Sequence, residues 1–199
     1  MINDRYKPLA QVAVCTGGCY VGGALNPAFV QADSPAIEVM TDLTKIPPAT
    51  VSPQETLHAA NQHMLLRGVR LLLVVERNGR ISGVVTARDL MGEKPILVAQ
   101  ARGAKREELE VRDVMTSLDV MEALKLSDVM RAEVGHIVAT LKACGRQHTL
   151  VVEEDQEANK QTLRGIFSAS QIARQLGVEL TTQEIARTFA EIEAAFAGV

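Results

Sequence analysis

The sequence predicts an α/β protein of the α+β type, in which one small unit of strands and helices occurs twice. Three observations predict this class. Short stretches of the first half recur in the same order in the second half, as in an internal repeat. Each copy has an apolar, β-branched run, a turn and a second such run, which is typical of two paired strands. Helix-start and helix-stop residues flank these runs in both copies.

Three landmarks define the repeat: VMT at 39–41 and 114–116, LLVVE at 72–76 with TLVVE at 149–153, and Gly83 with Gly165. The two copies are offset by 75 residues at the first landmark, 77 at the second and 82 at the third. The second copy is therefore longer before its helix and in the turn after its central strand. Surface turns tolerate such insertions.

Composition and charge limit the class of protein. A chain of 199 residues with 47% hydrophobic and only 3% aromatic residues can bury an aliphatic core. The net charge of −3 and the scattered basic residues argue against nucleic acid as a partner. No apolar run reaches the roughly 18 residues that span a bilayer. The polar start is unlike a signal peptide, so we expect no membrane and a cytoplasmic location.

Cysteine use and the lack of catalytic motifs in the sequence predict a protein without chemistry of its own. Cys15 and Cys19 form the pair CTGGC, which has no second CxxC motif or nearby His to complete a zinc site. A glycine-rich turn is favoured there over a metal or redox role. No Ser/His/Asp set or GxxxxGK[ST] loop occurs. We therefore expect no metal, no required cofactor and no enzyme activity.

The first copy begins with a helix. Ser52 is its predicted N-cap, Pro53 takes the first helical position and Glu55 completes a capping box. Gly68 is expected to end the helix. The predicted buried face consists of Leu57, Ala60, Met64 and Leu65.

A β-hairpin and a second helix complete the first copy. The run at 69–75 is a predicted buried strand, and Asn78-Gly79 is a hairpin turn that folds the run at 80–85 back antiparallel to it. A helix follows over 86–91. The second copy has the same order: a helix ending at Gly145, strands at 148–152 and 163–167, and a helix over 168–177.

A C-terminal helix over 181–197 and an N-terminal arm lie outside the repeats. The apolar residues of this helix recur at spacings of 4, 3 and 4, which places them on one face. They are Ile185, Phe189, Ile192 and Phe196. This face docks either on the chain's own repeats, which is favoured, or on a second subunit.

One motif follows the second strand in both copies, as TARD at 86–89 and as SASQ at 168–171. A Thr or Ser followed three residues later by Asp, Glu or Gln forms a capping box, in which each side chain accepts the other residue's backbone N–H. Taken alone, the motif favours a structural cap over a ligand site, because every helix start has unsatisfied N–H groups.

The doubled, ordered set of VMT, a helix ending in GVRLLLVVE, the Asn-Gly turn and GVVTARDL resembles the CBS-domain pair, or Bateman module, of stand-alone bacterial type. The resemblance covers about 34–178. It implies tandem CBS repeats, each a small sheet with two helices, paired by pseudo-two-fold symmetry. The implied parts are an N-terminal arm at 1–33, a first repeat at 34–100, a second repeat at 101–178 and a C-terminal amphipathic helix at 179–199.

The resemblance also implies two ligand clefts shared between the repeats. In CBS pairs the Asp of the motif accepts hydrogen bonds from both ribose hydroxyls of an adenosine nucleotide and faces the residues before the other repeat's central strand. A carboxylate suits a vicinal diol, because its two oxygens accept two donors at once. The first implied site consists of Thr86, Asp89, Arg146, Gln147 and His148.

The second implied site is weaker. Gln171 stands where the first site has a carboxylate, and its neutral amide offers one acceptor oxygen. Arg70 is the one basic residue that this site is expected to keep. The site consists of Thr44, Ala49, Val69, Arg70, Ser168 and Gln171.

Two functions follow from the resemblance. The first is a regulatory, nucleotide-sensing homodimer that binds AMP, ADP, ATP or S-adenosylmethionine, with AMP or ATP favoured, and signals to an effector protein. The alternative is a ligand-independent dimerisation or scaffold protein with degenerate CBS sites. Thr86, Asp89 and His148 favour the first function, whereas Gln171 supports the alternative.

Overall fold

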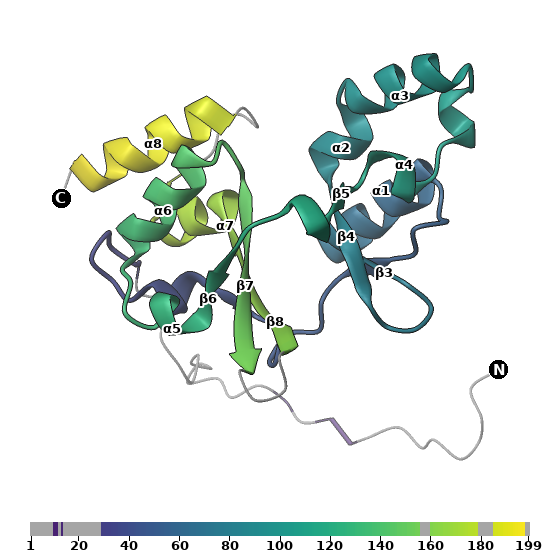
Figure 1. Ribbon diagram of the computed structural model, residues 1–199. Helices are drawn as coiled ribbons and strands as arrows, with labels where there is room; N and C mark the ends of the chain where they lie inside the picture. The colour runs from purple at the N-terminus through teal and green to yellow at the C-terminus, as the bar shows by residue number, and fades with distance from the viewer. Residues whose placement is uncertain (1–9, 12, 14–28, 156–159, 179–184, 198–199) are drawn as a thin grey trace.

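The computed structural model describes residues 10–11, 13, 29–155, 160–178 and 185–197. These residues form two units, each built on a small four-stranded sheet with helices packed against it (Figure 1). The α+β class with two small sheets is therefore confirmed. Cys15 and Cys19 lie outside the described residues. No helix in the described part of the chain is long and apolar enough to cross a membrane.

The first unit has a sheet in the strand order β2, β3, β4, β5. Its strands are β2 (Thr50–Val51), β3 (Leu71–Val75), β4 (Ile81–Thr86) and β5 (Thr116–Ser117). Its helices are α1 (Leu57–Arg67), α2 (Ala87–Met91), α3 (Lys94–Arg102), the short 3-10 helix η2 (Arg106–Glu108) and α4 (Val111–Val114). The sequence predicts α1, α2 and the hairpin of β3 with β4, and it does not predict the other elements.

The second unit has a sheet in the strand order β1, β8, β7, β6. Its strands are β1 (Thr41–Asp42), β6 (Ala123–Lys125), β7 (His148–Asp155) and β8 (Lys160–Ser168). Its α-helices are α5 (Leu126–Val129), α6 (Val134–Ala143), α7 (Ala169–Gln175) and α8 (Ile185–Ala197). Two 3-10 helices, η1 (Ala36–Val39) and η3 (Leu118–Val120), precede β1 and β6.

Each sheet takes one strand from the start of the other repeat. Strand β1 pairs antiparallel with β8, and β5 pairs antiparallel with β4. The two sheets consequently have the same order, β2-β3-β4-β5 and β6-β7-β8-β1, with parallel pairing in the first step and antiparallel pairing in the others. The strands are thus related as a pseudo-two-fold pair. The predicted boundaries separate the two copies along the sequence, but each sheet contains one strand from the other side of the boundary.

The recurring glycines lie where the exchanged strands approach. Gly83 pairs with Ser117 of β5, and a Cβ atom on Gly83 would lie 2.5 Å from the carbonyl oxygen of Thr116. Gly165 lies against the side chain of Met40, whose Cγ would be 2.7 Å from a Cβ atom at that position. The VMT segment of one copy therefore contacts the recurring glycine of the other copy, once in each sheet.

Helix α1 begins later than the sequence predicts. Its N-cap is Thr56, whose Oγ1 accepts a hydrogen bond of 3.2 Å from the Ala59 N–H. The predicted capping residues form a turn instead, with the Ser52 N–H donating to Glu55 Oε1 at 3.3 Å. The Glu55 carbonyl accepts from the Val111 N–H at 2.8 Å, so a tertiary contact with α4 uses a carbonyl that a helix would need. The predicted start at Ser52 is therefore wrong.

The other end of α1 and the hairpin agree with the sequence. Gly68 has the left-handed φ of 62° that ends the helix. Gly79 closes the hairpin turn with a φ of 81°. Leu65, however, is 67% exposed and does not belong to the buried face, which Leu57, Ala60 and Met64 form as predicted.

The two units pack together through their sheets. Alternate residues of a strand point to opposite faces, so Leu72 and Val74 of β3 pack on the helices of the first unit. Leu71 and Leu73 point the other way and pack with Leu150 of β7 in a cluster shared by both sheets. The clefts between the units therefore open beside a buried apolar contact.

Helix α8 packs on the second unit of its own chain, beside α6 and α7 (Figure 1). Phe189 and Ile192 are buried in the core of that unit, and Phe196 packs at its edge. Lys142 of α6 forms an ion pair of 2.5 Å with Glu193. The favoured alternative for this helix, docking on the chain's own repeats, is confirmed. The Ile185 side chain lies outside the described part.

Candidate functional site

Two clefts lie where the units meet, and each is named here after the residue that begins the helix beside it. The Thr86 cleft has a volume of about 170 Å³ and the Ser168 cleft about 630 Å³. The Thr86 cleft is lined by Leu71, Val84, Thr86, Arg88, Thr116, Met121, Leu150 and the segment 145–148. The cleft that the sequence implies to be the weaker site is thus the larger one.

The structure brings four of the five residues of the first implied site together. Thr86, Arg146, Gln147 and His148 line the Thr86 cleft, whereas Asp89 does not. Asp89 Oδ2 accepts hydrogen bonds from the Thr86 N–H at 2.9 Å and from Thr86 Oγ1 at 2.6 Å. The Asp89 N–H donates back to Thr86 Oγ1 at 3.3 Å, which completes the predicted capping box.

The second oxygen of Asp89 also has a partner. Lys94 of α3 forms an ion pair with Asp89 Oδ1 at 3.2 Å, and its Nζ also donates to the carbonyl of Met115 at 3.3 Å. Sequence analysis missed Lys94, because the helix that carries it was not predicted. A ribose diol would have to compete with this ion pair for the carboxylate.

The Ser168 cleft draws its walls from both repeats. The segments 46–49 and 67–71 of the first repeat line it, together with residues of β8 and α7 from the second. Five of the six residues predicted for this site line it: Ala49, Val69, Arg70, Ser168 and Gln171. Thr44 is not among the lining residues.

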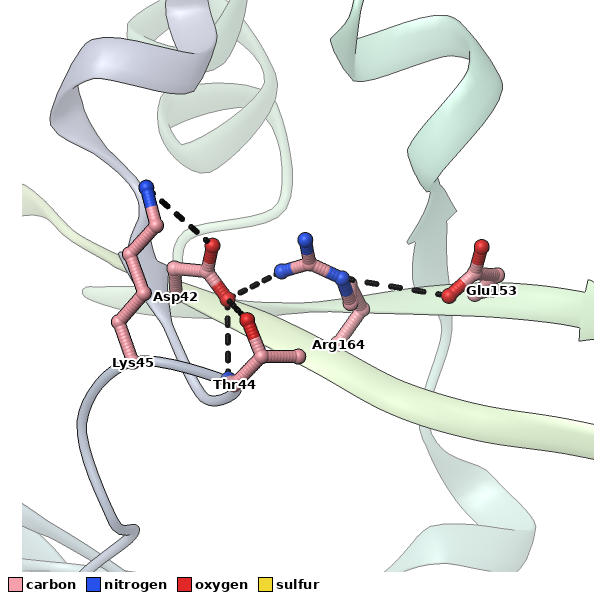
Figure 2. A network of polar contacts seen from close by, with 5 residues as sticks. All are labelled: Asp42, Thr44, Lys45, Glu153 and Arg164. Carbon is pink, nitrogen blue, oxygen red and sulfur yellow. Dashed lines mark hydrogen bonds and ion pairs between the residues drawn. The ribbon is translucent and has the colours of Figure 1, made fainter.

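Thr44 belongs to a polar network at the base of β1 (Figure 2). Its N–H and Oγ1 donate to Asp42 Oδ1 at 2.9 Å and 2.6 Å. These hydrogen bonds, followed by the positive charge of Arg164, lower the pKa of the Asp42 carboxyl group. Asp42 also forms an ion pair with Arg164 of β8, and the Nε of Arg164 lies 3.9 Å from Glu153 Oε2. Thr44 thus belongs to the polar contacts that hold β1 next to β8, and it does not line the cleft.

The predicted capping box of the second copy is not formed. Ser168 lies next to the hydroxyl of Ser170 at 3.0 Å and makes no side-chain cap. Gln171 Oε1 accepts a hydrogen bond of 3.0 Å from Thr41 Oγ1 in the exchanged strand. The amide of Gln171 is therefore oriented by β1, beside the cleft.

The Ser168 cleft is more basic than the sequence predicts. Besides Arg70, the side chains of Arg67 on α1 and Arg174 on α7 line it. Among the described residues that line this cleft there is no Asp or Glu. Its other walls are largely apolar, and they include Leu43, Ile46, Pro47, Pro48 and Ile166. The arginines come from segments far apart in sequence, which is why no local pattern indicated them together.

His148 lines both clefts. It is the first residue of β7, and it pairs with Ser168 across the sheet. Burial, and then the positive charge of Arg70, lower the pKa of His148 to about 4, although Asp89 acts in the opposite direction. The imidazole is therefore neutral at neutral pH, and it separates the two clefts as an uncharged wall.

The two clefts are equivalent by the repeat but differ in their side chains. At the repeat offsets, Thr86 and Asp89 correspond to Ser168 and Gln171. By the same offset, Arg88 of the Thr86 cleft corresponds to Ser170 of the Ser168 cleft.

Comparison with known proteins identifies the fold. Residues 36–95 match the family model of the CBS domain. An uncharacterized conserved protein from Pyrococcus horikoshii has a similar structure with a TM-score of 0.52 and 19% identity, covering 76% of this chain and 98% of that chain. No curated protein matches the chain.

Two further solved structures are similar. The CBS-domain containing protein ATU1752 from Agrobacterium tumefaciens has a TM-score of 0.50 and 17% identity, covering 79% of this chain and 98% of its own. CBSX2 from Arabidopsis thaliana, in complex with AMP, has a TM-score of 0.50 and 19% identity, covering 71% of this chain and 94% of that chain. The segment at 36–95 thus matches the CBS domain, and the chain, with the equivalent strand order of its two sheets, has a fold similar to that of these CBS-domain proteins.

Proposed function

We propose that this protein is a regulatory module that binds an adenosine-containing ligand in the Ser168 cleft and signals to an effector protein. The observation that carries the proposal is the cleft itself. Its volume of about 630 Å³ lies within the range of roughly 300–1,000 Å³ typical of small-molecule sites. The complex of the structurally similar CBSX2 with AMP supports this ligand class.

The walls of the cleft suit the parts of such a ligand. The apolar residues Ile46, Pro47 and Pro48 offer a surface for a flat base. Ser168 and Gln171 offer hydrogen-bonding groups for a ribose. The amide oxygen of Gln171 already accepts a hydrogen bond from Thr41. A ligand in this position contacts both repeats at once, so its binding can change how they are held together, which is what a sensor requires.

The Thr86 cleft is proposed as a secondary position. Its volume of about 170 Å³ is below the usual range for a small-molecule site. Thr86, Arg146, Gln147 and His148 are in place there, but Asp89 is engaged by its cap and by Lys94. A ribose bound there could use the Asp89 carboxylate only if the Asp89–Lys94 ion pair opened.

The setting of this function is part of the same proposal. We propose a cytoplasmic homodimer that has no catalytic role and that acts on another protein. Leu65 and Leu66 on α1 are 67% and 84% exposed, which agrees with a surface that meets another chain. Light scattering on the purified protein measures the oligomeric state directly.

The proposal is tested by thermal unfolding with adenosine, AMP, ADP, ATP and S-adenosylmethionine. A ligand that binds only the folded state at about 100 times its Kd adds roughly 2.7 kcal/mol, or several degrees in Tm. We expect such a shift for at least one of these compounds. If none moves the midpoint at millimolar concentration, the ligand-independent scaffold replaces the sensor.

A matched pair of variants locates the binding. Ser170→Tyr fills the Ser168 cleft and should abolish the shift without changing the midpoint of the free protein. Arg88→Ser is the control at the equivalent position of the other cleft, and it should leave the shift unchanged. The opposite result would place the ligand in the Thr86 cleft.

A further inference from the structure

We propose that the Ser168 cleft selects its ligand by charge: phosphate groups bridge Arg67 of α1 and Arg174 of α7, and the cationic sulfonium of S-adenosylmethionine is rejected. This inference rests on the proposed function and names the ligand class within it. Because the two arginines belong to different units, the same anion that is recognised also links the units.

The charge of the cleft is the first argument. The whole chain has a net charge of −3, yet Arg67, Arg70 and Arg174 line this one cavity. No described residue of its lining carries a carboxylate. Like charges in a cavity with apolar walls focus the field and raise the local concentration of anions. A ligand with a permanent positive charge meets the opposite effect.

The availability of the two bridging arginines is the second argument. Among the ion pairs of the described residues, none includes Arg67 or Arg174. Arg174 uses only its Nε in a hydrogen bond, at 3.3 Å to the carbonyl of Ser170. A guanidinium has five N–H donors in a planar fork, so most of them remain for a phosphate.

The position of the arginines is the third argument. Arg67 is the last residue of α1, directly before Gly68, and Arg174 lies in the last turn of α7. Both helices end beside the cleft, one in each unit. A di- or triphosphate has several charged oxygens along its length and can engage both side chains, whereas adenosine has no phosphate oxygens.

The test is isothermal titration of the full protein at about pH 7.5, where His148 is neutral, without divalent cations. The probes are adenosine, AMP, ADP, ATP, S-adenosylmethionine and inorganic tripolyphosphate. We expect affinity to rise from AMP to ATP, with adenosine and S-adenosylmethionine at least roughly ten-fold weaker than AMP, in line with the loss of charge-assisted hydrogen bonds. Binding of ATP should also weaken as salt is raised.

Variants of the two arginines sharpen the test. Arg67→Gln and Arg174→Gln should each weaken ATP binding by roughly ten-fold and leave adenosine unaffected. Arg67→Lys and Arg174→Lys keep the charge and should retain part of the affinity. Arg88→Gln, in the Thr86 cleft, should change affinity by less than about two-fold, as a matched control.

The outcomes separate this inference from the proposed function. If adenosine or S-adenosylmethionine binds as tightly as ATP, charge selection is overturned while adenosine binding stands. If tripolyphosphate binds in an Arg174-dependent way and adenosine compounds add nothing, the anion site stands and adenosine binding is overturned. If only Arg88→Gln reduces ATP binding, the phosphates lie in the other cleft and the inference is wrong.

Discussion

His148 is the residue on which both clefts converge, and its protonation state depends on its surroundings. Burial is the main cause of its lowered pKa of about 4, and the nearby charge of Arg70 adds to it. An ordinary histidine, with a pKa of about 6.5, is partly charged near neutrality, whereas this one stays neutral. The fold therefore keeps a positive charge out of the wall between the clefts.

The lowered pKa of His148 predicts a loss of stability in acid. Between about pH 6.5 and pH 4 the unfolded chain binds a proton at this histidine that the folded protein does not bind. The contribution is thus fully present above pH 6.5 and is lost as the pH falls toward 4, by on the order of 3 kcal/mol. Roughly 2 kcal/mol of it is lost by about pH 5, and urea unfolding at about pH 7.5 and about pH 5 measures this part.

The control for this prediction is His148→Gln, which cannot titrate. The other histidines are common to both proteins, so their effects cancel in the comparison. Asp42 does not interfere, because its lowered pKa places its own loss of stability below about pH 4. An equal pH dependence in wild type and variant would show that His148 is not the group responsible.

Gly83 and Gly165 test how tightly the exchanged strands fit. In Gly83→Ala the new Cβ would lie 2.5 Å from the backbone oxygen of Thr116, which cannot move without shifting β5. In Gly165→Ala it would meet the side chain of Met40, which has rotatable bonds. We expect Gly83→Ala to lower the free energy of unfolding by about 1–3 kcal/mol and Gly165→Ala to lower it less. Chemical denaturation of both variants measures the difference, and Gly79→Ala, which meets no atom within 4 Å but has a positive φ, separates steric contact from backbone strain.

At the scale of elements, the apolar face of α8 packs on the second unit of its own chain. The helix contributes Phe189 and Ile192 to the core of the second unit, with exposures of 3% and 0%. Thr188 beside them is also buried, at 2%. The apolar face of this helix is buried in the core of its own chain, so a homodimer must use a surface other than that face.

Removing the apolar contacts of α8 should therefore lower stability rather than change mass. Phe189→Ala is expected to cost about 3 kcal/mol or more in free energy of unfolding, as for other large-to-small core substitutions. Lys142→Gln removes the ion pair with Glu193 on the surface and should cost less than about 1 kcal/mol. Denaturation measures both costs, and light scattering measures mass. Dissociation of an oligomer by Phe189→Ala without loss of stability would contradict this assignment.

The whole molecule is held together by reciprocal strand exchange and by one apolar contact between sheets. Strands β1 and β5 each complete a sheet whose other strands come from the other repeat, and Leu71, Leu73 and Leu150 fill the space between the sheets. The Ser168 cleft opens beside this contact, and Gln171 on its wall is hydrogen-bonded to Thr41 of β1. A ligand in the cleft therefore touches both the exchanged strand and the residues that receive it.

The sequence by itself determined the elements whose signals are local. The Asn78-Gly79 turn, the buried run of β3, the box of Thr86 with Asp89 and the ending of α1 at Gly68 depend on residues a few positions apart. The internal repeat determined the doubling, and with the resemblance it led to the fold class, to four residues that line the Thr86 cleft and to five that line the Ser168 cleft.

The tertiary structure alone decided what depends on contacts between distant segments. The two-residue strands β1 and β5 are too short to show alternation, so only pairing reveals them. The start of α1 moved from Ser52 because a distant segment uses the Glu55 carbonyl. The larger cleft, and the arginines that meet in it, depend on side-chain size and on the approach of α1 and α7, and a linear pattern records neither.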